Sequence, residues 1–122
     1  MRYLVLLTGT RLTDAPPELM KAIMDLGGEA TAAGALLDTA GLAPATDAAR
    51  VQLRSGHLSV MDGPFTEAKE VISYALYDVR SKEEAVEWSR RFMAAHQEHV
   101  PGWDGVADVL RVMGPEDFAP PA

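Results

Sequence analysis

Two helix-forming segments interrupt a series of strand-forming segments, and this order restricts the fold more than any other feature of the chain. Residues 2–8 are apolar on both strand faces, which is typical of a central strand. A helix is expected to open at Pro17, because proline is tolerated in a first turn, and to stop at Gly34. A short strand is predicted for residues 35–38.

A hairpin pattern follows in the middle of the chain. Apolar and polar side chains alternate through residues 51–61 on both sides of Ser55-Gly56, a pair that suits a tight turn. Residues 65–72 are then expected to form a turn of helix. Residues 73–79 are rich in tyrosine and aliphatic side chains, which predicts another strand.

A capping box marks the start of the second helix. Ser81 is expected to cap the helix while Glu84 reaches back to it. The helix is predicted to run to about His99, and residues 106–113 form the last predicted strand.

The predicted fold class is therefore α+β: a ferredoxin-like sandwich (βαβ-hairpin-βαβ) with two helices on one face of an antiparallel sheet. We expect one domain over residues 1–122, with a short tail over residues 116–122. Two helices can cover only one face of such a sheet. The open face needs a partner, so we expect a homodimer whose two sheets pack face to face.

The composition restricts the kinds of site and partner. Without cysteine, the chain can form neither a disulfide nor a thiolate site. A net charge of −7 repels phosphate backbones and argues against a nucleic-acid partner. The first apolar run is too short for a membrane span, so we expect a cytoplasmic protein without a membrane partner. No metal-site spacing or glycine-rich phosphate loop occurs, and no cofactor is expected.

The segment from Asp62 to Glu70, Asp-Gly-Pro-Phe-Thr-Glu-Ala-Lys-Glu, resembles the signature of the DGPF-domain proteins, a branch of the YCII-related family. The resemblance extends over nearly the whole chain. Its further parts are the opening of the second helix and the residues beyond it: Val79–Trp88, Phe92, Met93, His96, Pro101–Gly105 and Pro115–Phe118. The resemblance implies a dimeric α/β barrel of the ferredoxin-like type, in agreement with the order of elements.

The activity that this resemblance implies is less defined. Related barrels include isomerases, lyases, dehydrochlorinases and monooxygenase-like proteins, and YCII-like members have been proposed to use a His–Asp pair. DGPF proteins often accompany extracytoplasmic-function sigma factors, which implies a role near transcription initiation. The chain also departs from the family pattern, with Ser73 where a glycine is expected and Leu110 where an arginine is expected.

Asp62 and His96 are the candidate catalytic residues. A carboxylate at the end of a strand can act as a general base, and histidine is the side chain best suited to proton transfer near neutral pH. Each has a structural alternative. Asp62 can accept backbone N–H groups in an Asx-type turn, and His96 can complement the C-terminal end of a helix dipole.

Glu67, Lys69 and Tyr74 are the candidate ligand-binding residues. A lysine between Glu67 and Glu70 can bind an acidic ligand, or the three charges can form a solvated, ion-paired turn. Tyr74 and Trp103 can line an aromatic pocket or belong to the core.

We therefore expect a small homodimeric barrel protein that binds a small organic ligand, acidic or phenolic, in a pocket between the sheet and the helices. As an enzyme it would be a cofactor-independent lyase or isomerase that uses acid–base catalysis. The alternative is a non-enzymatic accessory or regulatory protein linked to an extracytoplasmic-function sigma factor. A structure in which Asp62 lies within hydrogen-bond distance of a proton-transfer partner inside a pocket would favour the enzyme. An exposed apolar patch outside the dimer interface would favour the regulator.

Overall fold

The computed structural model describes residues 1–65 and 69–118 of the 122-residue chain. The hairpin β3–β4 is inserted between β2 and β5, as predicted. The elements in chain order are β1 (Arg2–Gly9), α1 (Pro17–Ala32), β2 (Leu36–Gly41), the 3₁₀ helix η1 (Ala45–Asp47), β3 (Ala49–Arg54), β4 (His57–Asp62), β5 (Glu70–Asp78), α2 (Lys82–His99), β6 (Gly105–Arg111) and the 3₁₀ helix η2 (Pro115–Phe118).

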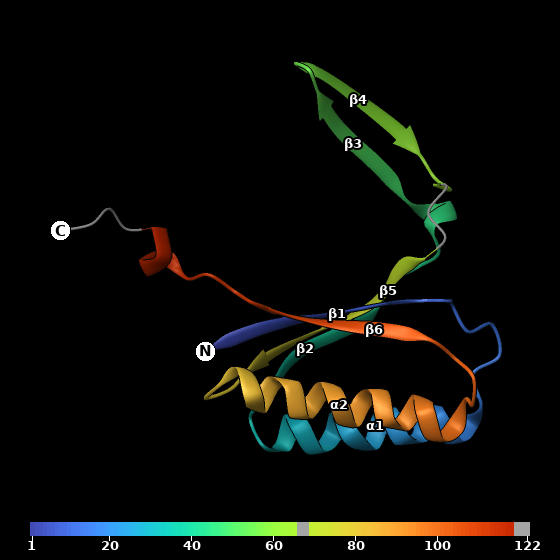
Figure 1. Cartoon of the computed structure of the whole chain (residues 1–122), viewed down its shortest axis with the longest axis vertical. Helices are drawn as coiled ribbons and strands as arrows, with labels where there is room; N and C mark the ends of the chain where they lie inside the picture. Colours follow the sequence, from blue (N-terminus) through green and yellow to red (C-terminus); the bar gives the residue numbers. More distant parts are fainter. Residues whose placement is uncertain (66–68, 119–122) are drawn as a thin grey trace.

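Four strands form one antiparallel sheet in the order β2-β5-β1-β6, while β3 and β4 form a separate two-stranded ribbon. The helices α1 and α2 lie side by side on one face of the four-stranded sheet (Figure 1). Each helix joins two strands that are not neighbours in the sheet, β1 to β2 and β5 to β6. This is the ferredoxin-like α+β arrangement that the sequence predicts.

Capping chemistry explains where α2 begins. The extended Ser81 accepts the backbone N–H of Glu84 on its Oγ at 3.2 Å. The Glu84 carboxylate accepts the backbone N–H of Arg80 at 3.0 Å, so it reaches back one residue beyond the cap. The predicted capping interaction is confirmed. The other helix, α1, opens with Pro17 and has no side-chain cap.

The core lies between the sheet and the helices. Along β1, Tyr3, Val5 and Leu7 are buried, while Leu4 and Leu6 are half-buried on the opposite face of the strand. Small side chains bring the helices close to the sheet. Besides the β1 side chains, the buried residues of this core are Ala30, Ala35, Tyr77, Val79 and Ala85.

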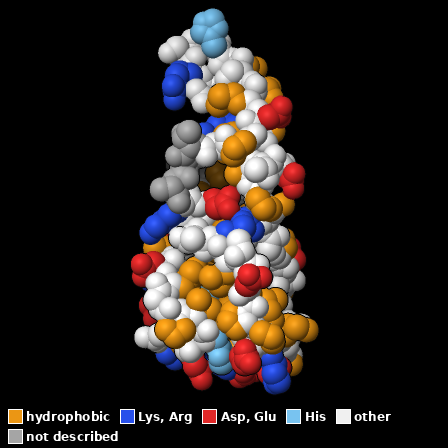
Figure 2. Space-filling model, turned by 90° about the vertical axis from the view of Figure 1, so that its right-hand side faces the viewer, with side chains coloured by type: hydrophobic (Ala, Val, Ile, Leu, Met, Phe, Trp, Pro, Cys, Tyr) orange, Lys and Arg blue, Asp and Glu red, His pale blue; other side chains and the backbone are white. Residues whose placement is uncertain are grey.

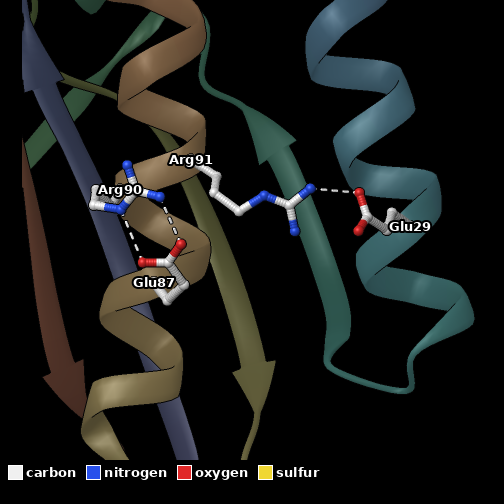
Figure 3. Close-up of polar contacts among 4 residues, drawn as sticks. All are labelled: Glu29, Glu87, Arg90 and Arg91. Carbon is white, nitrogen blue, oxygen red and sulfur yellow. Dashed lines mark hydrogen bonds and ion pairs between the residues drawn. The ribbon is translucent and has the colours of Figure 1, made fainter.

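One ion pair connects the two helices at the surface, and another lies within α2. Arg91 of α2 donates to Glu29 of α1 at 2.5 Å, and within α2 Arg90 makes two hydrogen bonds with Glu87 (Figure 3). These side chains are largely exposed, so solvent screens the attraction and the pairs add little stability. The helices are held mainly by the apolar contacts beneath them.

No described residue covers the face of the sheet opposite the helices, and this face is mostly apolar, with Tyr74 and Asp108 on either side of Leu6. The register places Leu4 between Leu76 and Leu110 on this face, and it places Val71 and Val106 on either side of β1 further along. Val106 is 48% exposed and Leu110 is 47% exposed.

The ribbon of β3 and β4 stands away from the sheet on its uncovered side (Figure 1). Its strands pair in register from Ala49 opposite Asp62 to Arg54 opposite His57. The turn residues Ser55 and Gly56 have positive φ angles of 51° and 79°, as a type I′ turn requires. The predicted hairpin and its turn are confirmed.

One predicted element is wrong. Residues 70–72 belong to β5 and do not form a turn of helix, because they continue the ladder with β1. A bulge interrupts the register between Leu7 and Thr8, and the shift hides the regular alternation that would have marked the strand. Residues 66–68 lie outside the described part of the chain.

Candidate functional site

An open hollow of about 830 Å³ lies at the base of the hairpin. Figure 2 shows the surface hollowed between the hairpin and the body, with acidic and basic side chains close together below it. Its volume falls in the range of small-molecule sites, roughly 300–1,000 Å³. Three segments far apart in sequence line it: Gly9–Arg11, then Leu42–Ala48 with Arg50, then Pro64, Phe65 and Lys69–Val71.

Arg11 and Glu70 hold two walls of the hollow together. Arg11 Nε donates to Glu70 Oε1 at 2.8 Å, and Glu70 Oε2 accepts the backbone N–H of Ala45 at 3.3 Å. The hydrogen bond from Arg11 lowers the pKa of Glu70, with help from the positive charge and from the Ala45 N–H, while desolvation opposes the shift. Glu70 therefore stays ionised at neutral pH and links the end of β1, η1 and β5.

The guanidinium group of Arg11 is not fully satisfied. Its Nη2 atom is buried and has no hydrogen-bond partner among the described residues. A buried charged donor without an acceptor is unfavourable. A ligand that brings an acceptor to Arg11 would remove this cost.

The described lining of the hollow contains more cationic than anionic side chains, although the chain is acidic. Its described lining contains Arg11, Arg50 and Lys69 against the two carboxylates of Asp47 and Glu70. The whole chain, by contrast, has a net charge of −7. The site therefore suits a ligand that carries negative charge.

The turn after β4 positions one wall of the hollow. The backbone N–H of Gly63 donates to the Ala48 oxygen at 2.7 Å, and a Cβ on Gly63 would lie 1.7 Å from the Ala45 oxygen. Only glycine permits this approach. Two residues on, the ring of Phe65 lies 3.9 Å from the Cζ atom of Arg50, a cation–π contact.

Of the three predicted ligand-binding residues, Lys69 lines this hollow. Glu67 lies outside the described residues. Tyr74 is placed elsewhere: its hydroxyl donates to Asp38 Oδ2 of β2 at 2.8 Å, and this hydrogen bond raises the pKa of Tyr74. Lys69 and Tyr74 do not line a common hollow within one chain.

The predicted catalytic residues Asp62 and His96 occupy different parts of the molecule. Asp62 ends β4 and is exposed, and its carboxylate makes no hydrogen bond to a described residue. His96 is 5% exposed, with Nδ1 2.9 Å from the Phe92 oxygen and its ring centroid 4.7 Å from that of Trp103. Because β4 and α2 lie on opposite sides of the sheet (Figure 1), the two residues do not meet within one chain. Their catalytic roles stay predictions.

A second cavity lies where the sequence predicts the ligand pocket, between the sheet and the helices. It is apolar and has a volume of only about 70 Å³, with Val5, Ile23 and Phe92 among its lining residues. Ser73, at a position where relatives are expected to have glycine, also lines it. A cavity that admits benzene measures roughly 150 Å³, so this cavity is too small for an aromatic ligand. The ligand-sized space lies instead at the base of the hairpin.

Comparison with known proteins identifies the family of the chain. The sequence profile of the YCII-related domain matches residues 1–100. The chain belongs to the YCII-related family. An uncharacterised protein of Rhizobium meliloti (strain 1021) is 42% identical to it over 59 residues, which cover 48% of this chain and 48% of that protein. The match therefore spans about half the length of this relative.

The YCII-related chain has no helix, among those the structure describes, that combines the length and apolarity needed to cross a membrane. Over residues 1–65 and 69–118, no three His, Asp or Glu side chains are grouped so that they could hold a metal ion.

Sequence reasoning missed two residues of this YCII-related site, Arg11 and Arg50. Arg11 follows β1 in an irregular stretch, and its partner Glu70 is 59 residues away, so no local spacing connects them. Arg50 occupies one polar position in an alternating strand, which is typical of an exposed side chain. Only the folding of three distant segments onto one another brings these cations together.

Proposed function

We propose that this YCII-related chain binds a small organic anion, a carboxylate or a phenolate, in the hollow at the base of the hairpin. One observation carries the proposal: the buried Nη2 atom of Arg11 has no hydrogen-bond partner among the described residues, and Lys69 lines the same hollow. In a partly enclosed site of low dielectric constant, such charges attract an anion more strongly than in water.

Arg11 and Lys69 are the proposed contacts for the anionic group. Glu70 holds the Arg11 guanidinium in place through a 2.8 Å hydrogen bond, so little side-chain freedom remains to be lost on binding. A planar guanidinium suits a carboxylate, while Lys69 adds a point charge. Leu42 and Pro44 provide apolar surface for the organic part of the ligand.

Binding is better supported than catalysis. We place the chain in the DGPF branch on its nine-residue segment, and the proposed chemistry, if any, is a cofactor-independent lyase or isomerase reaction. Asp62 and His96 do not meet within one chain, so a joint role as proton carriers requires that they come from two chains. Separately, we propose that two copies pair through the open sheet face, where Leu110 is 47% exposed.

An accessory role linked to a sigma factor is the second candidate. The observation that favours it is the apolar face of the hairpin, where Leu53 and Leu58 are 70% and 74% exposed. Exposed apolar patches are typical of surfaces that bind other proteins.

Isothermal titration with benzoate and 4-hydroxybenzoate as probes tests the ligand proposal. We expect the wild-type protein to bind at least one probe, and Lys69→Gln to weaken that binding about tenfold, the equivalent of ~1.4 kcal/mol. Lys82→Gln is the matched control, since it removes the same charge from an exposed position at the start of α2, outside the lining of the hollow. Failure of both probes to bind, or equal weakening by the two variants, would refute the proposal.

A further inference from the structure

The hairpin has one face that is almost entirely apolar. Cross-strand pairing places Val51 opposite Val60 and Leu53 opposite Leu58, so these four side chains point to the same side of the ribbon. Their exposed fractions lie between 70% and 74%. The other face carries the alternate residues Arg50, Gln52, Arg54, His57, Ser59 and Met61.

A ribbon of this kind is not stable by itself. Isolated two-stranded hairpins are marginal in water, and an apolar face left in solvent contributes nothing to stability. Neither β3 nor β4 joins the four-stranded sheet. The regular register of the ribbon therefore indicates a surface that is covered in the working assembly.

We propose that the hairpin is an arm whose apolar face packs on the body of a second copy of this chain, beside the open sheet face of that copy. The inference rests on the pairing of two copies proposed above and adds the contact that would hold them. In a two-fold arrangement each chain contributes one arm, so both apolar ribbons are covered at once.

The direction of the arm supports this occupant. The ribbon leaves the body on the side of the sheet that the helices do not cover (Figure 1). A second copy seated on the open face, against residues such as Leu4 and Leu110, would lie directly beside the ribbon. One partner molecule would then cover both uncovered apolar surfaces of the chain.

The formal charge of the hairpin is opposite in sign to that of the whole chain. From Ala49 to Asp62 the hairpin carries two arginines, Arg50 and Arg54, and a single carboxylate, whereas the whole chain has a net charge of −7. A slightly basic arm therefore meets an acidic body.

Sedimentation analysis of two double variants tests the arm. The wild type is expected at twice the 13.1 kDa chain mass at micromolar concentration. Leu53→Glu with Leu58→Glu is expected to raise the dissociation constant at least about tenfold, because charges replace buried apolar contacts. Gln52→Glu with Ser59→Glu is the matched control: it adds the same charges to the same strands on the opposite face, and is expected to leave the constant unchanged.

The possible results distinguish the proposed contact of the arm from the proposed pairing of two copies through the open sheet face. A wild-type monomer would overturn both proposals. A dimer that neither double variant weakens would overturn the arm and leave the pairing standing. Equal weakening by both variants would also overturn the arm, since the apolar face would then have no special role. Circular dichroism melting of each variant checks that the four-stranded body is folded.

Cross-linking locates the surface that the arm touches. The chain has no cysteine, so Ser55→Cys at the tip of the hairpin can carry a single photoreactive label. In a mixture of ¹⁴N and ¹⁵N chains, we expect cross-links between the two isotopic forms, from the label to the body of the other copy. Cross-links confined to one chain, or joining one arm to the other, would overturn the proposal.

Discussion

Arg11 and Glu70 are the side chains on which the geometry of the hollow depends most. Glu70 accepts from Arg11 at 2.8 Å and from the Ala45 backbone at 3.3 Å, so one carboxylate joins three segments of the chain. Both side chains are about one-third exposed, and solvent therefore weakens the pair without removing it. Loss of Glu70 would free Arg11 to move and would widen the hollow.

The lowered pKa of Glu70 makes part of the stability depend on pH. A carboxylate whose pKa is lower in the folded state stabilises the fold above the unfolded value, about 4.3, and loses this contribution as pH falls through the folded value. We expect the wild type to be more stable than Glu70→Gln in urea unfolding at pH 7, and the difference to shrink below about pH 4.3.

The control for this pH dependence is Glu98→Gln, because Glu98 is 76% exposed and its ion pair with His99 is long, at 3.8 Å. Its stability relative to the wild type is expected to change less with acid. A wild-type advantage over Glu70→Gln that stays constant from pH 7 into the acid range would contradict the role of the Arg11 pair.

At the scale of secondary-structure elements, Gly63, just after β4, connects the hairpin to the body. The close approach of Gly63 to Ala45 and Ala48 seats the base of the hairpin on η1. The nine-residue segment from Asp62 to Glu70 is thus explained in part by packing, since its glycine and its last glutamate both contact η1. Contacts between secondary-structure elements therefore explain why Gly63 and Glu70 occur at these positions, without a chemical role for either residue.

Gly63→Ala should be destabilising because its Cβ would lie 1.7 Å from the Ala45 oxygen and would force the hairpin base away from η1. We expect a loss of about 1–3 kcal/mol in the free energy of unfolding, measured by urea titration. Gly28→Ala is the matched control, since a Cβ there meets nothing within 4 Å in the middle of α1. It should stabilise the helix by up to about 1 kcal/mol. A Gly63→Ala protein as stable as the wild type would show that the contact with η1 is dispensable.

At the scale of the whole molecule, the chain has two mostly apolar surfaces that none of residues 1–65 and 69–118 covers. One is the open sheet face around Leu4, Leu76 and Leu110, and the other is the apolar side of the hairpin. The helices cover only the opposite face of the sheet (Figure 1). Such surfaces are expected to drive association, because their exposure to water is unfavourable.

Leu110→Glu tests the open face separately from the arm. We expect it to shift the protein toward the monomer in light scattering, because burying an unpaired carboxylate in a sheet-to-sheet contact is costly. Val86→Glu is the matched control: Val86 is 45% exposed on α2 and Leu110 is 47% exposed on β6, so the two substitutions differ mainly in the layer they occupy. If Leu110→Glu is as dimeric as Val86→Glu, the two copies do not meet through the sheet.

The ferredoxin-like order, the capping of α2 at Ser81 and the hairpin turn at Ser55-Gly56 could be predicted from the sequence. Each depends on interactions between residues close together in the chain, such as side-chain caps, turn angles and periodic burial. The start of β5 could not be predicted, because its bulged pairing with β1 is set by a strand more than sixty residues away.

For the candidate site, sequence alone determined that the segment from Asp62 to Glu70 matters and that Lys69 is a ligand-binding candidate. The tertiary structure alone decided where that segment lies and which groups join it: Arg11 and Arg50 reach the same hollow from separate segments, while His96 packs against Trp103 elsewhere. The physical reason is how far apart the interacting residues are in the sequence. Local patterns specify helices, strands and turns. A charged hollow forms when distant segments come into contact, and residue spacing along the chain does not predict such contacts.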